Sequence, residues 1–414
     1  HIQAPPPIDE DRVAAAGIRK VEGKHVTVFT DVPAAPGVDE LPRVFDLAIE
    51  PWCEYFGVRA DVVEDWKVRA YLMDRRELFE QAGLLPENLP RFGHGYSQHG
   101  ELWLFDQPSD YYRRHLLLHE GTHLFMQTYL RGMGPPWYSE GMAELLATHR
   151  WKDGELRLRY FPQNRDEVPY WGRIKIVKTE YAAERWLSIE EITKFGPTAH
   201  LDVEPYGWCW AIAAFLDGHP QFSERFRQLT RYVDDPPRQL TQRFHDLFSP
   251  DARRLIEQWR LFVANVEYGY DLRREAIRYE PTAFDRDATT VLEIRADRGW
   301  QSTGLVVSPG TTYVLEASGR YQLDQEPKIW WCEPGGVTIR YHDGHPLGML
   351  LAGVSDQTKP LANMTPLADP QPIGLRRELQ FDRAGTLFLR INDSPADLEN
   401  NRGQARVELR KTDR

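Results

Sequence analysis

The 414-residue sequence predicts a multidomain α+β protein in which an α/β lobe is followed by a helical lobe and then by an all-β sandwich. A chain of this length is too long for one hydrophobic core. Its first part mixes strand and helix patterns, and after Pro281 the pattern changes to short alternating strands separated by turn residues. We expect four regions: a loosely held arm at 1–20, an α/β lobe at 21–186, a helical lobe at 187–280 and a sandwich at 281–414.

The α/β lobe begins with a strand, HVTVFTDV, whose apolar residues alternate. Helical spacing follows in VDELPRVFDLAIEPWCEYFGV, and two further strands are predicted in KVRAYLMD and GELWLFD. An edge strand is expected near 95–105, where an extended peptide could add as another strand. A long helix, about 110–130, closes this region.

The helical lobe is predicted from packing patterns such as GWCWAIAAFL and ARRLIEQWRLFVANV. The sandwich is predicted from six alternating segments between Gly, Pro, Asn and Asp turns: TVLEIRA, TGLVVSP, TYVLEAS, GVTIRY, GTLFLRI and ARVELRK.

Composition limits the class of protein. With 41% hydrophobic and 27% charged residues, the chain can build a folded core. Its net charge of −11 and the lack of a basic tract argue against a nucleic-acid partner. No run of eighteen apolar residues predicts a membrane-spanning helix. The three widely spaced cysteines (Cys53, Cys209 and Cys332) predict neither a disulfide framework nor a Cys-rich metal site.

The chain opens at His1 on a Pro-rich stretch, as a mature or trimmed chain would. A removed secretion signal, which this chain does not contain, would make the protein secreted or periplasmic. We therefore expect the protein to be secreted or periplasmic.

An HExxH sequence, His119 to His123, lies in the long helix. Two histidines four apart share one helix face, so both imidazoles can bind one ion, and Glu120 beside them can take a proton from water. The expected metal is zinc. A bare HExxH also occurs by chance on solvated helices, so the assignment needs a third ligand.

The third ligand is predicted after the break at Pro135-Pro136, where WYSEGMAE begins a second helix. Glu140 can supply a carboxylate oxygen, which gives the three protein ligands and one open position of a catalytic zinc site. Glu144, one turn further along, can accept the free ring N–H of a ligating histidine.

This pattern resembles the gluzincins, the clan of zinc peptidases that contains thermolysin and the aminopeptidase N-like enzymes. The resemblance is specific over about 110–150 and weaker from about 24 to 220. It implies that His119, His123 and Glu140 are the zinc ligands, that Glu120 is the general base and that Glu144 matches the carboxylate one turn after the ligand. No Gly-x-Met-Glu-Asn sequence precedes the HExxH, so the resemblance favours an endopeptidase.

Other residues compete for roles at this site. His115, one turn before His119, could be a further imidazole ligand, although packing is the simpler interpretation. His149 is expected at the surface. The resemblance also implies a residue that stabilises the oxyanion; Tyr206 is the first candidate, and Tyr138, Tyr170 and Tyr181 are its rivals.

The C-terminal region, about 299–409, resembles the galactophilic bacterial lectins. In that family a calcium ion and the sugar share a loop, and Asp393, Asp397, Asn400 and Asn401 fall at the corresponding offsets. Such oxygen donors suit Ca²⁺, although NDSPADLENN is also simply turn-like in composition. The family's His-Pro-x-Gln sugar-contacting stretch is not recognisable here.

The sequence therefore predicts zinc-dependent hydrolysis of a peptide or protein, glycosylated or not, by a chain with a C-terminal substrate- or glycan-docking module. Two alternatives stay open. The chain could be a carbohydrate-binding or adhesion protein that carries a peptidase-like lobe, or a zinc hydrolase acting on a non-peptide amide or a glycoconjugate.

Overall fold

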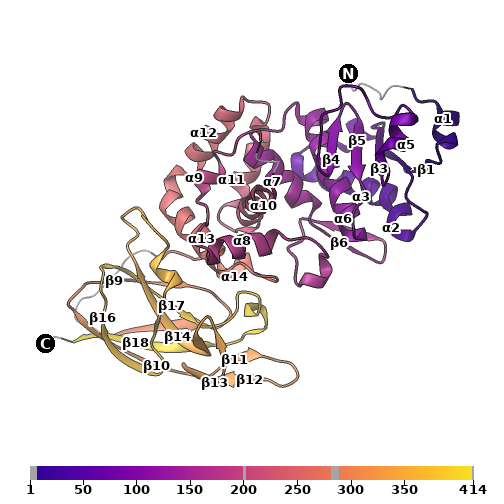
Figure 1. Ribbon diagram of the computed structural model, residues 1–414. Coiled ribbons are helices and arrows are strands. Elements are labelled where there is room, and N and C mark those ends of the chain that lie inside the picture. Colours follow the sequence, from indigo (N-terminus) through magenta and orange to yellow (C-terminus); the bar gives the residue numbers. More distant parts are fainter. Residues whose placement is uncertain (1–6, 199–201, 281–288, 413–414) are drawn as a thin grey trace. The chain divides into compact units, whose positions relative to one another are not determined.

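The computed structural model describes residues 7–198, 202–280 and 289–412. It is a mixed α/β chain in which a helical region precedes a C-terminal region rich in β-sheet (Figure 1). Two compact units are present. The first runs up to Val177 and includes Glu190–Asp217 and Glu224–Leu247, and the second comprises Lys178–Ile189, Gly218–Ser223 and the chain from Phe248 onward.

The first unit is built on a five-stranded sheet of order β1-β2-β3-β5-β4. Strands β2, β3 and β5 are parallel, whereas β1 and β4 pair antiparallel at the two edges. The strands are β1 (Arg19–Glu22), β2 (Val26–Thr30), β3 (Val68–Met73), β4 (Gly95–Gln98) and β5 (Glu101–Phe105). The edge strand expected near 95–105 corresponds to β4, which ends one side of the sheet.

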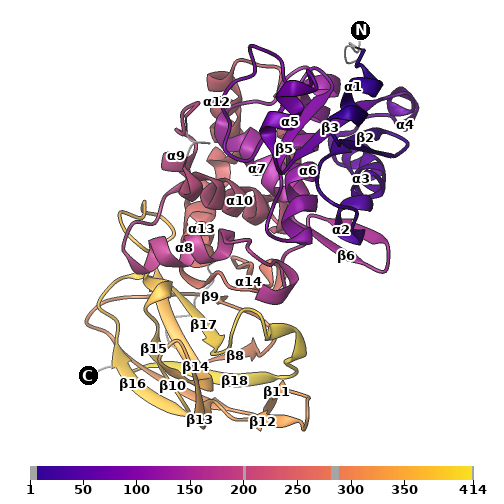
Figure 2. The same cartoon turned by 45° about the vertical axis from the view of Figure 1, so that its right-hand side comes forward.

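The two faces of this sheet are covered differently (Figure 2). One face packs against α1 (Glu10–Ala15) and α5 (Arg76–Gln81) through a cluster that includes Val13, Ile18 and Phe79. The other face carries α6 (Asp110–Phe125), which is continued by a π-helical turn, Met126–Leu130. Helix α3 (Leu41–Phe56) packs on α6 at Gly121, where an added Cβ would lie 2.8 Å from the rings of Phe45 and Trp52. The one Gly of the HExxH helix is thus a close-approach point.

The N-terminal segment differs from the expected loosely held arm. Residues 1–6 lie outside the described residues, but α1 and β1 form within 7–22, and Val13 and Ile18 are only 3% and 4% exposed. Burial of these apolar side chains against the sheet holds the segment in place.

Helix α7 (Pro136–Ala147) follows the Pro135-Pro136 break, with Pro136 at its first position, where a missing N–H costs nothing. It packs against α6 and against α10 (Val203–Gly218). Gly141 permits the second contact, since an added Cβ would lie 2.9 Å from the Cys209 carbonyl oxygen. Gly207 likewise lets α10 approach α8 (Arg173–Ala182), with an added Cβ 2.7 Å from Ile176.

The remaining elements before the β-rich region are mainly helices. They are α2 (Pro36–Asp39), α4 (Ala60–Val63), the hairpin strands β6 (His149–Lys152) and β7 (Glu155–Leu158), α9 (Ile189–Ile192), α11 (Ser223–Gln228), α12 (Pro237–Phe248), α13 (Ala252–Asn265) and α14 (Leu272–Glu275). None of the helices among the described residues is long and apolar enough to cross a membrane.

In the second unit, two antiparallel sheets share one core. One sheet has the order β16-β10-β18-β8, and the other has β13-β14-β17-β9 with β15 beside β14. The strands are β8 (Thr290–Arg295), β9 (Gln301–Val307), β10 (Thr312–Ser318), β11 (Tyr321–Asp324), β12 (Trp330–Cys332), β13 (Gly335–His342), β14 (His345–Ser355), β15 (Gln371–Pro372), β16 (Arg376–Gln380), β17 (Gly385–Ile391) and β18 (Gln404–Thr412).

The compact unit that contains these sheets begins before residue 281. Helix α13 belongs to it: Leu261 packs with Trp300 and Phe388 in a second apolar cluster, and Glu257 is fully buried among polar groups of the β14–β15 segment.

Candidate metal centre

Helices α6 and α7 bring three metal-binding side chains together. His119 and His123, one turn apart on α6, are 5% and 8% exposed, and their Nε2 atoms lie 3.2 Å apart. Glu140 of α7 places Oε2 3.4 Å from His119 Nε2 and 3.5 Å from His123 Nε2. The three residues therefore present one donor atom each to a common point.

These distances fit a tetrahedral ion. Bonds of about 2.0–2.1 Å, the usual range for zinc to nitrogen or carboxylate oxygen, require donor atoms about 3.3–3.4 Å apart. The observed separations are 3.2, 3.4 and 3.5 Å. Two imidazoles and one carboxylate are also a donor set of catalytic zinc. The residues present thus fit zinc in geometry and in chemistry.

Charge at this point also suits a cation. Burial alone would raise the pKa of Glu140, but the imidazoles of His123 and His119 hold that pKa well below its usual value. Burial would lower the pKa of His119, yet Glu140 and Glu144 raise it well above its ordinary value. A positive charge at this point is therefore stabilised by the carboxylates around it, as a bound cation would be.

Glu144 contacts the Nδ1 side of the His119 ring, and not the Nε2 atom that faces the other two donors. Its Oε1 accepts a hydrogen bond from His119 Nδ1 at 3.2 Å, and a carboxylate oxygen lies 3.4 Å from His115 Nε2. Arg173, the first residue of α8, donates from Nε to Oε2 and from Nη2 to Oε1, both at 2.8 Å. Burial would raise the pKa of Glu144, but Arg173 and His115 hold it well below its usual value.

His115, His119 and Glu144 form a second group whose donor atoms could hold a cation. Both oxygens of Glu144 are already bound by the Arg173 guanidinium, which supplies the compensating positive charge. His115 is 2% exposed and stacks on Tyr112, with the ring planes 3° apart and the centroids 5.5 Å apart. His115 is therefore a packed residue next to Glu144, and not one of the three convergent donors.

Glu120, the candidate base, is 7% exposed and lies beside the first residue of β4. A Cβ on Gly95 would be 2.7 Å from Glu120 Oε1 and 2.8 Å from its Cγ. The absence of a side chain at Gly95 leaves the space that the Glu120 carboxylate fills, so the base lies next to the sheet edge.

Tyr206, near the start of α10, is the tyrosine at this site. Its ring lies 5.9 Å from that of His119 in an edge arrangement, and the Arg173 guanidinium carbon lies 5.5 Å from its centroid. Burial, followed by Glu140, Glu144 and Glu120, raises its pKa, so Tyr206 stays protonated and can donate a hydrogen bond.

The three rival tyrosines are placed elsewhere. Tyr138 packs against Trp137 and Phe226, with Asp217 as its nearest influential charge. Tyr170 is 75% exposed, and Tyr181 belongs to the second unit.

His149, expected at the surface, is buried. It is 1% exposed, stacks on Tyr111 with centroids 4.6 Å apart, and its Nδ1 bonds the Ala147 carbonyl at 2.8 Å. The expectation of surface exposure is wrong because α7 ends at Ala147 and the following hairpin turns His149 back onto α6.

Sequence reasoning missed Arg173 and Gly95. Arg173 lies 29 residues after Glu144, on a helix with no ligand-like spacing. Only the packing of α8 on α10 brings it to the site. Gly95 carried no signal beyond its place in the expected edge strand.

The Asp393 loop is well ordered by internal hydrogen bonds. Asp393 is 2% exposed; Asn401 Nδ2 donates to its Oδ2 at 2.8 Å, and the Ser394 amide donates to its Oδ1 at 2.8 Å. Asn400 Nδ2 lies 3.4 Å from Asp324 Oδ1. Oδ1 of Asn400 and Oδ1 of Asn401 are buried without a protein partner. Burial raises the pKa of Asp393 to about 6 and also raises that of Asp397.

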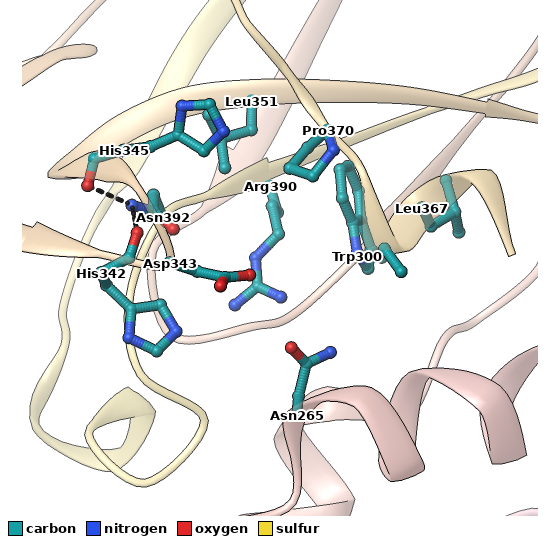
Figure 3. A pocket seen from close by; sticks show the side chains of 11 residues that line it. Asn265, Trp300, His342, Asp343, His345, Leu351, Leu367, Pro370, Arg390 and Asn392 are labelled. Atoms are coloured by element: carbon teal, nitrogen blue, oxygen red, sulfur yellow. Dashed lines mark hydrogen bonds between the residues drawn. The ribbon is translucent and has the colours of Figure 1, made fainter. Parts of the chain in front are cut away.

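A cavity lies next to this loop (Figure 3). Asn392, which precedes Asp393, donates to the carbonyls of His342, His345 and Pro346 and so fixes the β13–β14 turn. At about 20 Å³ the cavity has room for about one water molecule. The lining residues are Asn265, Trp300, His342, Asp343, His345, Leu351, Leu367, Ala368, Pro370, Arg390 and Asn392.

Comparison with known proteins gives weak likenesses. No protein-family model and no curated protein matches the chain. Solved structures that resemble it include the EclA N-terminal domain, a PllA-like lectin, at 21% identity over 30% of this chain and 98% of that one, with a TM-score of 0.23. They also include the IMPa metallopeptidase in complex with T-antigen, at 9% identity over 93% of this chain, with a TM-score of 0.18. The chain spans 46% of that metallopeptidase's length.

Proposed function

We propose that the chain is a zinc-dependent hydrolase that cleaves peptide bonds, with His119, His123 and Glu140 as the metal ligands. The observation that carries this proposal is the set of three donor separations, 3.2, 3.4 and 3.5 Å, in a buried site with Glu120 next to the first ligand. Surface helices with incidental histidines have no reason to converge on a partly buried carboxylate of a second helix.

His119, His123 and Glu140 would hold the zinc, which would supply a Lewis acid for the scissile carbonyl and would lower the pKa of a water molecule there. Glu120 takes the proton from that water and passes it to the departing amine. Tyr206, whose ring lies 5.9 Å from that of His119, would donate a hydrogen bond to the oxyanion that forms. Glu144 keeps His119 in the tautomer whose Nε2 is free to bind the metal.

A substrate backbone can align along β4, which is the edge strand next to Glu120. An extended segment bound there has no need of a free terminus, so we favour endopeptidase activity. A gluzincin-type arrangement, in which the edge strand and the two metal-binding helices surround the scissile bond, is the finer form of this proposal.

A second candidate function belongs to the C-terminal unit. The two buried amide oxygens of Asn400 and Asn401, which have no protein partner, lie in one loop with Asp393 and Asp397. Such an oxygen set suits calcium. We propose that this loop binds calcium and that the unit docks a substrate or glycan. If the chain binds glycans and hydrolyses nothing, it is an adhesion protein that carries a peptidase-like unit.

The test of the first proposal is Glu120→Gln in the zinc-loaded protein, assayed on a mixed peptide library. The amide cannot accept the proton, so cleavage should fall by at least about 100-fold while zinc content stays at one per chain. Glu77→Gln, an exposed residue of α5, is the matched control and should keep native activity.

Cleavage by Glu120→Gln at close to the native rate would remove Glu120 as the base. A zinc-loaded native protein that cleaves no peptide but does cleave glycopeptides or non-peptide amides would keep the site and change the substrate class.

A further inference from the structure

Arg173 is a buried cation that the proposed chemistry does not use. Its side chain is 7% exposed, and it lies on α8, which carries none of the proposed ligands. An unpaired guanidinium is costly to bury, so a buried arginine needs a partner that compensates its charge.

The pairing partner is Glu144, which Arg173 binds at two points. Nε donates to Oε2 and Nη2 donates to Oε1, each at 2.8 Å. Two parallel hydrogen bonds fix the plane of the carboxylate as well as its position. Glu144 is 1% exposed and lies within reach of two imidazoles, since His119 Nδ1 is 3.2 Å away and His115 Nε2 is 3.4 Å away. The two hydrogen bonds from Arg173 therefore determine how the Glu144 carboxylate is oriented toward His119 and His115.

The same guanidinium also contacts Tyr206. Its carbon lies 5.5 Å from the centre of the tyrosine ring, within the range of a cation–π interaction. That ring also lies near His119, at 5.9 Å between centroids. Arg173 thus touches the residue that orients one ligand and the residue proposed to bind the oxyanion.

We propose that Arg173 is a positioning residue of the metal centre. It raises zinc affinity by holding Glu144 against His119, and it holds the Tyr206 ring next to the same histidine. This inference rests on the proposed zinc site. It needs the planar, forked geometry of arginine, because a lysine ammonium supplies the charge without the two-point grip or the flat face.

The experiment is a measurement of zinc dissociation constants by chelator competition on the full chain. Arg173→Lys should weaken zinc binding by about 10- to 100-fold, the usual effect of disturbing a group that orients a ligand. Arg159→Lys is the matched control: Arg159 also pairs with a carboxylate, Asp217, at 2.9 Å and lies over a tyrosine ring, Tyr55, at 5.1 Å. Its zinc constant should equal that of the native chain even if its unfolding temperature falls.

Glu144→Gln provides the second variant and a double-mutant cycle. If Arg173 acts through Glu144, Glu144→Gln weakens zinc binding to a similar extent, and adding Arg173→Lys to it weakens binding little further. An unchanged zinc constant in Glu144→Gln overturns the inference, whether or not Arg173→Lys folds. Full additivity in the double variant overturns it as well.

The native chain is measured first. If the native chain binds no zinc, both the proposed function and the role of Arg173 are refuted. If it binds one zinc tightly and Arg173→Lys binds zinc within twofold of native, the proposed function stands and the role of Arg173 is refuted.

Discussion

At the scale of single residues, the candidate site depends on two glycines as well as on the side chains that could bind a metal. Gly121 lets α3 approach the HExxH helix, and Gly95 leaves room for the Glu120 carboxylate at the sheet edge. Both are glycines because of close approach, and neither has the positive φ that would demand glycine for the backbone alone.

Gly95→Ala should reduce hydrolysis without releasing zinc. The new Cβ would lie 2.7 Å from Glu120 Oε1, so the carboxylate must move. A displacement of this kind costs about 10- to 100-fold in turnover. Gly93→Ala is the control, since an added Cβ there meets nothing within 4 Å. Native turnover of Gly95→Ala at native zinc content would show that the position of Glu120 tolerates the change.

His149 gives the first unit an acid-sensitive element. Burial, with Arg114 and His115 nearby, lowers its pKa from 6.5 to about 3. The unfolded chain therefore takes up a proton below about pH 6.5 that the folded chain does not, so the stability due to the neutral ring is lost as pH falls. At pH 4.5 this linkage amounts to roughly 2–3 kcal/mol.

The measurement is the free energy of unfolding in urea at pH 7 and pH 4.5. His149→Gln should be less stable than native at pH 7 but should lose less stability on acidification. His245→Gln, at an exposed position of α12, should keep the native pH dependence. An unaltered pH dependence in His149→Gln would contradict the assignment.

At the scale of elements, the sequence predicted what local spacing determines. Motif spacing predicted the helices α6 and α7, and alternation predicted the edge strand. On these two helices, His119, His123 and Glu140 lie close enough together to hold one metal ion. Arg173, the burial of His149 and the docking of the N-terminal segment were not found, because each depends on how separate elements pack. A buried arginine and a solvated one look the same in a sequence.

The Asp393–Asn401 loop, not the zinc site, should account for any effect of calcium. Calcium bound only by the folded loop raises the free energy of unfolding by about 2.7 kcal/mol at 100 times its dissociation constant. Asp393→Ala should abolish the calcium-dependent rise in unfolding temperature and leave peptide cleavage unchanged. If native protein shows no calcium-dependent shift, the loop is stabilised by its own hydrogen bonds alone.

At the scale of the whole molecule, α13 is part of the β-rich unit, which also includes Lys178–Ile189 and Gly218–Ser223. Glu257 is buried and accepts hydrogen bonds from Gln357 Nε2 at 2.6 Å, from Thr365 Oγ1 at 3.0 Å and from Ser355 Oγ. Leu261 adds apolar contact with Trp300 and Phe388. Helix α13 therefore completes the outer face of the β14–β17 sheet.

A fragment from Phe248 to the C-terminus keeps α13 with the two sheets and should be the more stable of two truncated forms. A fragment that starts at 281, the boundary predicted from the sequence, leaves Ser355 and Thr365 without their carboxylate and exposes Trp300, so it should be less stable by at least about 2 kcal/mol. Urea unfolding of both fragments makes the comparison. Equal stability would show that α13 contributes nothing to the unit.

We propose that His119, His123 and Glu140 hold one zinc ion. Crystals of the chain purified with zinc, measured on both sides of the zinc absorption edge, test it most directly. We predict one anomalous peak about 2.0–2.2 Å from His119 Nε2, His123 Nε2 and a Glu140 oxygen. A peak bound elsewhere, or a Glu140 side chain turned away from both imidazoles in the presence of zinc, would contradict the account.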